Sequence, residues 1–539
     1  MGKKGFTLIE LLAVIVILAI VALIATPIIL GIIRDSKENA NKRSIDNYAK
    51  AVENAIAKYQ LDGKKLEEII MKTTDGRNFS NVEDFKVEYE GNVVCDTIEI
   101  YEDGNMYLDK CKVNGKLIDY KYGNFKTYID QANVMVRVPT GLSPVIYKDN
   151  HWEIISSQDK WYDYNNQEWA NAVILNDDVS KKPGTQLNIE TDVKAIFVYI
   201  PRYSYTIGNT YGVQLEGANS PSQSTPGAID IKFVSTKTKE KGSGVYTGNI
   251  PSGWYTHPAF TFGEEELEGI WVGKFQISHI DSSKSTTSLN CTNENCEEAD
   301  NLRIIPNVIP LQNNVSNFFY GIRSMSRNKN KFNITGNTHM IKNSEWGAVA
   351  YFSQSKYGKY GNSNYLGVDK EIYQNKSFSG VTGMSNGTPP KATQNTQCSY
   401  DNVINNCGIG ASTTGNIYGI YDMSGGKFEY VMGYLKTSST IWGATSNGNY
   451  AGFTNKPSSK YYDEYSLYGN DDKGHAISEI STASKKNTAW YGDDSFFIVP
   501  SSPWVQRGSV SNSASTGMFS FNYYTGGVRG SSRVILIQN

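Results

Sequence analysis

The chain begins MGKKGFTLIELLAVIVILAIVALIATPIILGII, residues 1–33. A short basic stretch precedes an apolar run, residues 6–33, in which Glu10 is the one charged side chain. As a helix, those 28 residues would span about 42 Å, more than the ~30 Å hydrocarbon core of a bilayer. A cleaved secretory signal has a shorter apolar stretch with small residues at its end, whereas Gly5 stands before this run. We therefore expect residues 6–33 to cross a membrane, with a functional carboxylate inside the span.

Residues 5–12, GFTLIELL, resemble the class III prepilin signal of type IV pilins and type II secretion pseudopilins. Pro27 stands where many pilin helices are loosened. The resemblance implies cleavage of residues 1–5 by a prepilin peptidase, N-methylation of the new terminal Phe6, and assembly of the 6–33 helix with other pilin subunits. It also implies that Glu10 pairs with the Phe6 α-amino group of a neighbour in the filament. An ordinary signal anchor, with Glu10 near the membrane interface, is the alternative.

A pilin head is expected in residues 34–130. Beyond Ile33, apolar residues recur at spacings of three and four, which predicts an amphipathic helix that ends near Leu61, with Gly63 as its stop. The residues of this stripe are Ile45, Tyr48, Val52, Ile56 and Tyr59. Alternation in residues 85–90, strand-like stretches at 93–101, 106–113 and 117–122, and an Asn114-Gly115 turn predict an antiparallel meander against the helix.

The six cysteines fall into three pairs that are local in sequence: Cys95/Cys111, Cys291/Cys296 and Cys398/Cys407. The first pair is symmetric about residue 103, the centre of a predicted hairpin loop, so its sulfurs would face each other. An even count in an exported chain favours disulfides, although spacing alone does not fix the pairing. Zinc is the alternative, but a single CxxxxC without a nearby CxxC or His pair is poor ligand spacing. No metal site is expected.

Residues 140–539 are expected to form a second module of many short strands and long loops, after a boundary within residues 123–145. Several of its segments resemble the formylglycine-generating-enzyme-like, or sulfatase-modifying-factor, branch of the C-type-lectin fold. They are 269–278 (GIWVGKFQIS), 344–346 (SEW), 416–431 (NIYGIYDMSGGKFEYV), 505–509 (VQRGS) and 533–537 (RVILI). Residues 161–203 are expected to extend this module at its N-terminal side. The predicted fold class is α+β: a long pilin helix with a small antiparallel sheet, followed by a large irregular C-type-lectin-like module.

Catalysis is not expected. The enzymatic branch holds copper with two cysteines in the C-terminal part of its domain, whereas this chain has no cysteine after Cys407 and has Phe428 in place of a signature Trp. No catalytic residue and no cofactor are predicted, and calcium is left open. The balance of 52 basic and 54 acidic residues, net charge -2, gives no field that would attract nucleic acid. Five His in the chain argue against a His-based site.

Tyrosine is concentrated near the C-terminus, where residues 418–539 hold 12 of the 36. Tyr with Ser, Gly and Asn is typical of adaptable binding surfaces. The candidate ligand-binding residues are Tyr461, Tyr462, Tyr465, Tyr468, Phe521, Tyr523 and Tyr524. The alternative is that these rings pack between irregular loops. Residues 507–533 also resemble the variable regions of lectin-fold proteins that retroelements diversify.

The combined prediction is a minor type IV pilin or pilus-tip adhesin that displays a non-catalytic lectin-fold module toward an unknown glycan or protein ligand. It would be a single-pass protein of the bacterial inner or cytoplasmic membrane before assembly and part of an extracellular pilus afterwards. One alternative is a type II secretion or competence pseudopilin, with a mechanical or DNA-uptake role. A second is an oxidase of the formylglycine-generating type.

Overall fold

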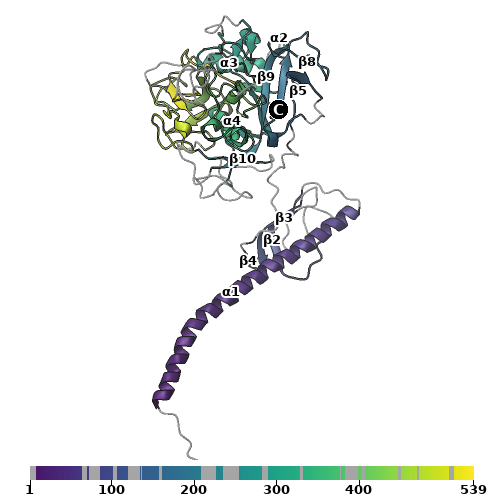
Figure 1. Cartoon of the computed structure of the whole chain (residues 1–539), viewed down its shortest axis with the longest axis vertical. Coiled ribbons are helices and arrows are strands. Elements are labelled where there is room, and N and C mark those ends of the chain that lie inside the picture. Colours follow the sequence, from purple (N-terminus) through teal and green to yellow (C-terminus); the bar gives the residue numbers. More distant parts are fainter. Residues whose placement is uncertain are drawn as a thin grey trace, which may run out of the picture. The chain divides into compact units, whose positions relative to one another are not determined.

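The computed structural model describes residues 8–62, 69–71, 85–100, 106–118, 120, 134, 136–156, 161–207, 226–234, 254–281, 289–327, 332–376, 378–382, 398–402, 407–446, 451–469, 473–508 and 515–538. The chain divides into two compact units, residues 1–126 and residues 127–539. Each unit has its own cluster of buried apolar side chains. The fold is α+β and consists mostly of sheets, with few helices (Figure 1).

The first unit is built on one long helix, α1 (Leu8–Leu61). It ends at the predicted residue, while Gly63 lies outside the described residues. The side chains of Glu10 and Pro27, with most of the predicted 6–33 span, also lie outside them, as do Gly5 and Phe6. In the part of the chain whose side chains are described, no helix is both long enough and apolar enough to cross a membrane.

A four-stranded antiparallel sheet packs against the C-terminal half of α1. Its strands are β1 (Ile69–Met71), β2 (Val93–Ile100), β3 (Met106–Val113) and β4 (Lys116–Leu117), in that order. Asn114 and Gly115 turn the chain between β3 and β4 with φ of 51° and 76°, as an Asn-Gly hairpin requires. The common core holds Ile45, Tyr48, Val52 and Ile56 of the helix together with the apolar faces of β2 and β3.

Three details of the predicted meander differ in the structure. The closing strand ends at Leu117 rather than near 122, and β1 was not predicted. Residues 85–89 form no strand, although Phe85 and Val87 are buried in the core. Lys86 makes a single β-bridge, and the alternation reflects the packing of Phe85 and Val87 in the core shared with the helix.

The second unit contains an eight-stranded antiparallel sheet in the order β18-β23-β15-β9-β7-β5-β6-β8. Its strands are β5 (Ser143–Lys148), β6 (His151–Ile154), β7 (Asn171–Leu175), β8 (Gln186–Leu187), β9 (Val193–Pro201), β15 (Gly269–Gly273), β18 (Asn337–Met340) and β23 (Val534–Ile537). Every residue of β7 and β9 is buried. β7 and β9, both within residues 161–203, therefore lie in the interior of the sheet, and β9 pairs directly with β15.

A second sheet has the order β20-β19-β21-β22: β20 (Asp463–Tyr465), β19 (Glu429–Leu435), β21 (Trp504–Arg507) and β22 (Phe521–Tyr524). Small sheets join β10 (Tyr203–Thr206) to β11 (Asp230–Phe233) and β12 (Tyr255–Thr256), β13 (Thr261–Phe262) to β14 (Glu265–Glu266), and β16 (Ser278–His279) to β17 (Leu302–Arg303). The α-helices are α2 (Ile189–Asp192), α3 (Val315–Arg327) and α4 (Asn343–Ser353). Short 3-10 helices cover Tyr164–Asn166, Pro258–Phe260, Glu297–Asn301, Lys359–Gly361, Gly367–Lys370, Ile409–Ala411, Ser459–Tyr461 and Trp490–Gly492.

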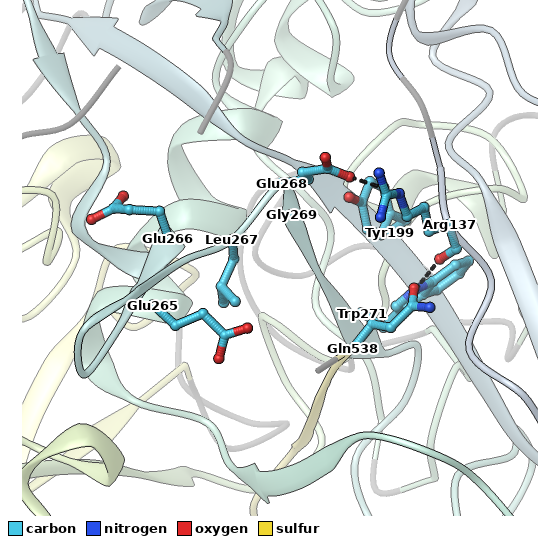
Figure 2. A pocket seen from close by; sticks show the side chains of 9 residues that line it. All are labelled: Arg137, Tyr199, Glu265, Glu266, Leu267, Glu268, Gly269, Trp271 and Gln538. Atoms are coloured by element: carbon cyan, nitrogen blue, oxygen red, sulfur yellow. Dashed lines mark hydrogen bonds and ion pairs between the residues drawn. The ribbon is translucent and has the colours of Figure 1, made fainter. Parts of the chain in front are cut away.

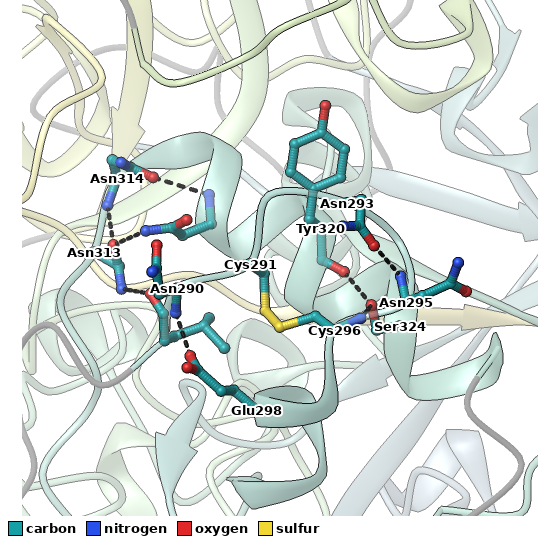
Figure 3. Close-up of a disulfide and its surroundings, with 12 residues drawn as sticks. Asn290, Cys291, Asn293, Asn295, Cys296, Glu298, Asn313, Asn314, Tyr320 and Ser324 are labelled. Atoms are coloured by element: carbon teal, nitrogen blue, oxygen red, sulfur yellow. Dashed lines mark hydrogen bonds between the residues drawn. A yellow bond between two sulfur atoms is a disulfide. The ribbon is translucent and has the colours of Figure 1, made fainter.

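Three disulfides use all six cysteines: Cys95–Cys111, Cys291–Cys296 and Cys398–Cys407. Cys95 and Cys111 are direct cross-strand partners on β2 and β3, in the register that their symmetry predicted. Cys291–Cys296 closes a short loop beside α3, where the Cys296 backbone N–H donates to Ser324 Oγ at 3.0 Å (Figure 3). The disulfides therefore hold short segments locally.

Candidate functional site

Three of the segments that carry the lectin-fold resemblance, residues 269–278, 416–431 and 533–537, meet in the interior of the second unit at Arg533. Its guanidinium makes two bonds to Glu429, from Nη2 to Oε1 at 2.6 Å and from Nε to Oε2 at 3.2 Å. It also donates to the carbonyl oxygens of Gly273, at 2.7 Å, and Tyr421, at 2.8 Å. Arg533 and Glu429 have no exposed side-chain surface. One cation therefore joins β19, β15 and the loop at residue 421 to the segment that leads into β23.

Two further buried groups complete this network. Asp422 accepts from the backbone N–H of Gln276 at 3.0 Å and from that of Gly380 at 2.8 Å. The Gln276 amide donates to Glu429 Oε1 at 3.1 Å. Burial raises the pKa of Asp422 and of Glu429, and Arg533 opposes that rise in both. These groups hydrogen-bond to one another away from solvent, which is the arrangement of a structural network.

Lys274 follows β15 and is a second buried cation. Its Nζ donates to Asn171 Oδ1 at 2.8 Å and to the Ile417 carbonyl oxygen at 2.6 Å. It lies 5.0 Å from the ring centroid of Trp152. Burial lowers the pKa of Lys274 well below that of a free amine. Like Arg533, this amine links distant segments and does not face solvent.

The structure corrects most of the predicted ligand-binding group. Tyr461, Tyr462, Tyr465 and Phe521 belong to the apolar core, with exposed fractions of 6%, 7%, 2% and 1%. Their polar atoms have internal partners: the Tyr465 hydroxyl, for example, lies 2.6 Å from His475 Nδ1. These rings pack between loops because the irregular C-terminal half has few helices or long strands to supply core residues.

Three of the predicted rings reach the surface. Tyr523 is 40% exposed, whereas Tyr468 and Tyr524 are half-buried. The Arg529 guanidinium lies 4.7 Å from the Tyr524 ring centroid. Tyr468 bonds the Ser481 hydroxyl at 2.7 Å. Tyr523 is thus the most exposed of the predicted rings.

A polar pocket of about 230 Å³ lies near the start of β15 (Figure 2). Arg137 and Glu268 line it and form an ion pair at 3.2 Å, and Trp271 donates its indole N–H to the Arg137 carbonyl oxygen at 3.1 Å. Glu266, also on its wall, pairs with the buried Arg202 at 2.7 Å. Three of the four charged residues of this lining, Arg137, Glu266 and Glu268, are thus engaged in ion pairs.

A second pocket, of about 390 Å³, was not predicted from the sequence. Four separate segments line it: the β5–β6 hairpin, residues 187–190, Asn307 and residues 399–401. Trp152 and Tyr400 are buried within its wall, and Tyr147 is half-buried. Glu190, Asn307 and Asp401 are exposed polar residues of its lining. The pocket thus combines aromatic rings with accessible carboxylate and amide groups.

No group of three or more His, Cys, Asp or Glu residues in the described part of the chain is placed to hold a metal ion.

The comparison with protein families gives one result, at the N-terminus. The prokaryotic N-terminal methylation motif matches residues 1–26, a range that contains Gly5, Phe6 and Glu10. The N-terminus is therefore type IV pilin-like. This signal implies processing by a prepilin peptidase and assembly with other pilins, and it indicates membrane insertion followed by a place in a surface pilus. No curated protein matches the chain.

Proposed function

We propose that this protein is a minor type IV pilin or pilus-tip adhesin, which assembles through its N-terminal helix and displays the second unit as a non-catalytic binding module. The methylation motif at residues 1–26 is the observation that carries the assembly half of this proposal. The helix that begins within the motif continues into a pilin-type head, in which a four-stranded sheet covers its C-terminal half.

Glu10 has a physical reason to take part in assembly. A carboxylate inside a membrane helix costs about 2.5–3.5 kcal/mol on insertion scales, so it requires a partner. After cleavage at Gly5, the methylated Phe6 amine of a neighbouring subunit supplies a positive charge for it. Incorporation into the filament then pairs the Glu10 carboxylate, which has no partner while the single helix lies in the membrane.

The size of the second unit favours the role of a minor pilin, present at the tip or at few positions of the filament. Residues 127–539 form a unit with its own core, far larger than the pilin head. Such a module on every subunit would be hard to accommodate in a densely packed shaft. At the tip or at rare positions it would face outward, where a binding surface is useful.

A C-type-lectin-like fold for this unit is supported by the elements at the segments that resemble that family. Residues 269–273, 504–507 and 534–537 are strands, and residues 343–353 are a helix. A non-catalytic role is supported by the cysteines, because all six are in disulfides and no thiolate is left to bind copper. A type II secretion or competence pseudopilin would carry the same N-terminal motif, and it differs from an adhesin in having no surface ligand.

The test compares Glu10→Ala with Glu38→Ala, a matched loss of a carboxylate on the same helix. Glu38 is exposed and pairs with Lys42 at 2.9 Å, outside the apolar run. Both variants should insert in the membrane, but Glu10→Ala should be lost from sheared filaments while Glu38→Ala is retained. Incorporation of Glu10→Ala at the wild-type level would remove the basis for assembly through this helix.

A further inference from the structure

We infer that the 390 Å³ pocket between the β5–β6 hairpin and residues 399–401 is a binding site for an uncharged saccharide. This inference rests on the proposed adhesin function and names the ligand class and the site. The volume lies within the ~300–1,000 Å³ that small-molecule sites occupy. The pocket lies entirely within the second unit.

The floor of the pocket is aromatic and rigid. The Tyr147 and Trp152 rings pack edge to face, with centroids 5.4 Å apart, and Tyr418 packs against the same indole at 5.8 Å. The Trp152 indole N–H is buried in this floor. Burial raises the pKa of Tyr400, and the interaction of the Tyr400 hydroxyl with this N–H lowers that pKa by a smaller amount. Of the lining rings of Tyr147, Trp152 and Tyr400, that of Tyr147 is partly exposed and offers apolar contact to the C–H face of a sugar ring, while the two buried rings support it from below.

The rim carries hydrogen-bonding groups with spare capacity. Glu190 Oε1 accepts from the Asn307 amide at 2.6 Å, and Asp401 Oδ1 accepts from the Ser399 hydroxyl at 2.5 Å. The second oxygen of each carboxylate makes no hydrogen bond to any residue that the structure describes. These two oxygens are acceptors for hydroxyl donors, and bonds to a charged acceptor are stronger than neutral ones.

Charge decides between ligand classes. Glu190 and Asp401 line the pocket, and the described part of the chain places no Lys or Arg in the lining, so an anionic ligand would be repelled. Burial, and next the Asp401 carboxylate, raise the pKa of Tyr147, which places that negative charge close to the aromatic floor. The two carboxylates by themselves would attract a cation, but Lys274 already lies 5.0 Å from the Trp152 ring centroid, so a cationic ligand would gain no contact with that ring face. A neutral ligand rich in hydroxyl groups satisfies both constraints.

The walls of the pocket are held in place by contacts within the protein, without a ligand. The Cys398–Cys407 disulfide is adjacent to Ser399–Asp401, and the Cys398 backbone is paired with Thr382. On the opposite wall, Asn188 caps α2 by accepting from the Glu190 backbone N–H at 3.0 Å. Preorganised walls reduce the entropy lost on binding.

The experiment measures binding of the methyl glycosides of galactose, glucose, mannose and N-acetylglucosamine to the detergent-solubilised full-length protein by saturation-transfer NMR. Sialic acid and methylamine serve as anionic and cationic probes. At least one neutral glycoside should bind, and Glu190→Ala and Asp401→Ala should each weaken it at least about tenfold. Asp178→Ala, an exposed carboxylate of the same unit outside the pocket, is the matched control and should bind as wild type.

Three outcomes would overturn the inference: no neutral glycoside binds, the charged probes alone bind, or binding survives in both rim variants. Because all three leave filament incorporation untouched, they are distinguishable from failure of the pilin role. Adhesion of intact filaments to cells without glycoside binding would retain the adhesin and reject this pocket.

Discussion

Arg533→Met should destabilise the second unit more than any surface substitution. The variant keeps much of the side-chain volume but removes the cation that bonds Glu429 at 2.6 and 3.2 Å. It also removes the donors to the Gly273 and Tyr421 carbonyl oxygens. Loss of one member of a buried pair typically costs about 3–5 kcal/mol, because the other charge stays buried without compensation.

The assay is equilibrium denaturation followed by tryptophan fluorescence. All nine Trp lie at or beyond residue 152, so the signal reports the second unit alone. The control is Arg529→Met, since Arg529 is exposed and contacts the Tyr524 ring at 4.7 Å. An exposed cation–π contact is worth about 0.5–1 kcal/mol, so this variant should remain close to wild type.

The loss of stability caused by Arg533→Met should depend on pH in a defined direction. Burial raises the pKa of Glu429, and without Arg533 that pKa rises further. The unfolded state then ionises at a lower pH than the folded state, so stability is lost as pH rises through the folded pKa. The cost of Arg533→Met should be smaller near pH 5 than near pH 8, and Glu429→Gln in the same chain should relieve part of it. A cost below about 1 kcal/mol at pH 8 would refute the assigned role of this network.

Two other predictions concern the same unit. Burial lowers the pKa of His257 well below its ordinary value, so the unfolded state takes up a proton first and the free energy of unfolding should fall as pH drops below about 6.5. His257→Gln should reduce this pH dependence in denaturation curves measured between pH 7.5 and 5. Some pH dependence should remain, because burial also lowers the pKa of His339. An unchanged pH dependence of the free energy of unfolding would contradict the role given to His257. Gly347→Ala should destabilise by roughly 1–3 kcal/mol despite the better helix propensity of Ala, because its Cβ would lie 1.9 Å from the Gly474 carbonyl oxygen. A gain in stability would show that this contact relaxes freely.

Local patterns predicted the local structure well. The end of α1 at Leu61 followed from the spacing of Ile45 through Tyr59, and the Cys95–Cys111 register followed from symmetry about the hairpin. The helix at residues 343–353 and the strands at 269–273 and 534–537 lie at segments that carry the family resemblance. Each depends on residues close together in sequence.

The long-range arrangement could not be predicted in the same way. The continuous apolar run of β9 marks a buried strand, but its neighbours, β7 and β15, follow from pairings that no local pattern encodes. Composition predicts a surface role for Tyr461 and Tyr465, which are buried, because tyrosine serves both cores and interfaces. The 390 Å³ pocket joins four segments that are distant in sequence, and none of them carries a recognisable motif by itself.

Assembly through the N-terminus is the central claim, and the most direct measurement is mass spectrometry of the N-terminal peptide from purified, sheared filaments. Processing at the methylation motif predicts a peptide that begins at N-methylated Phe6 and lacks residues 1–5. Recovery of the chain with Met1 intact, found in membranes and absent from filaments, would contradict it.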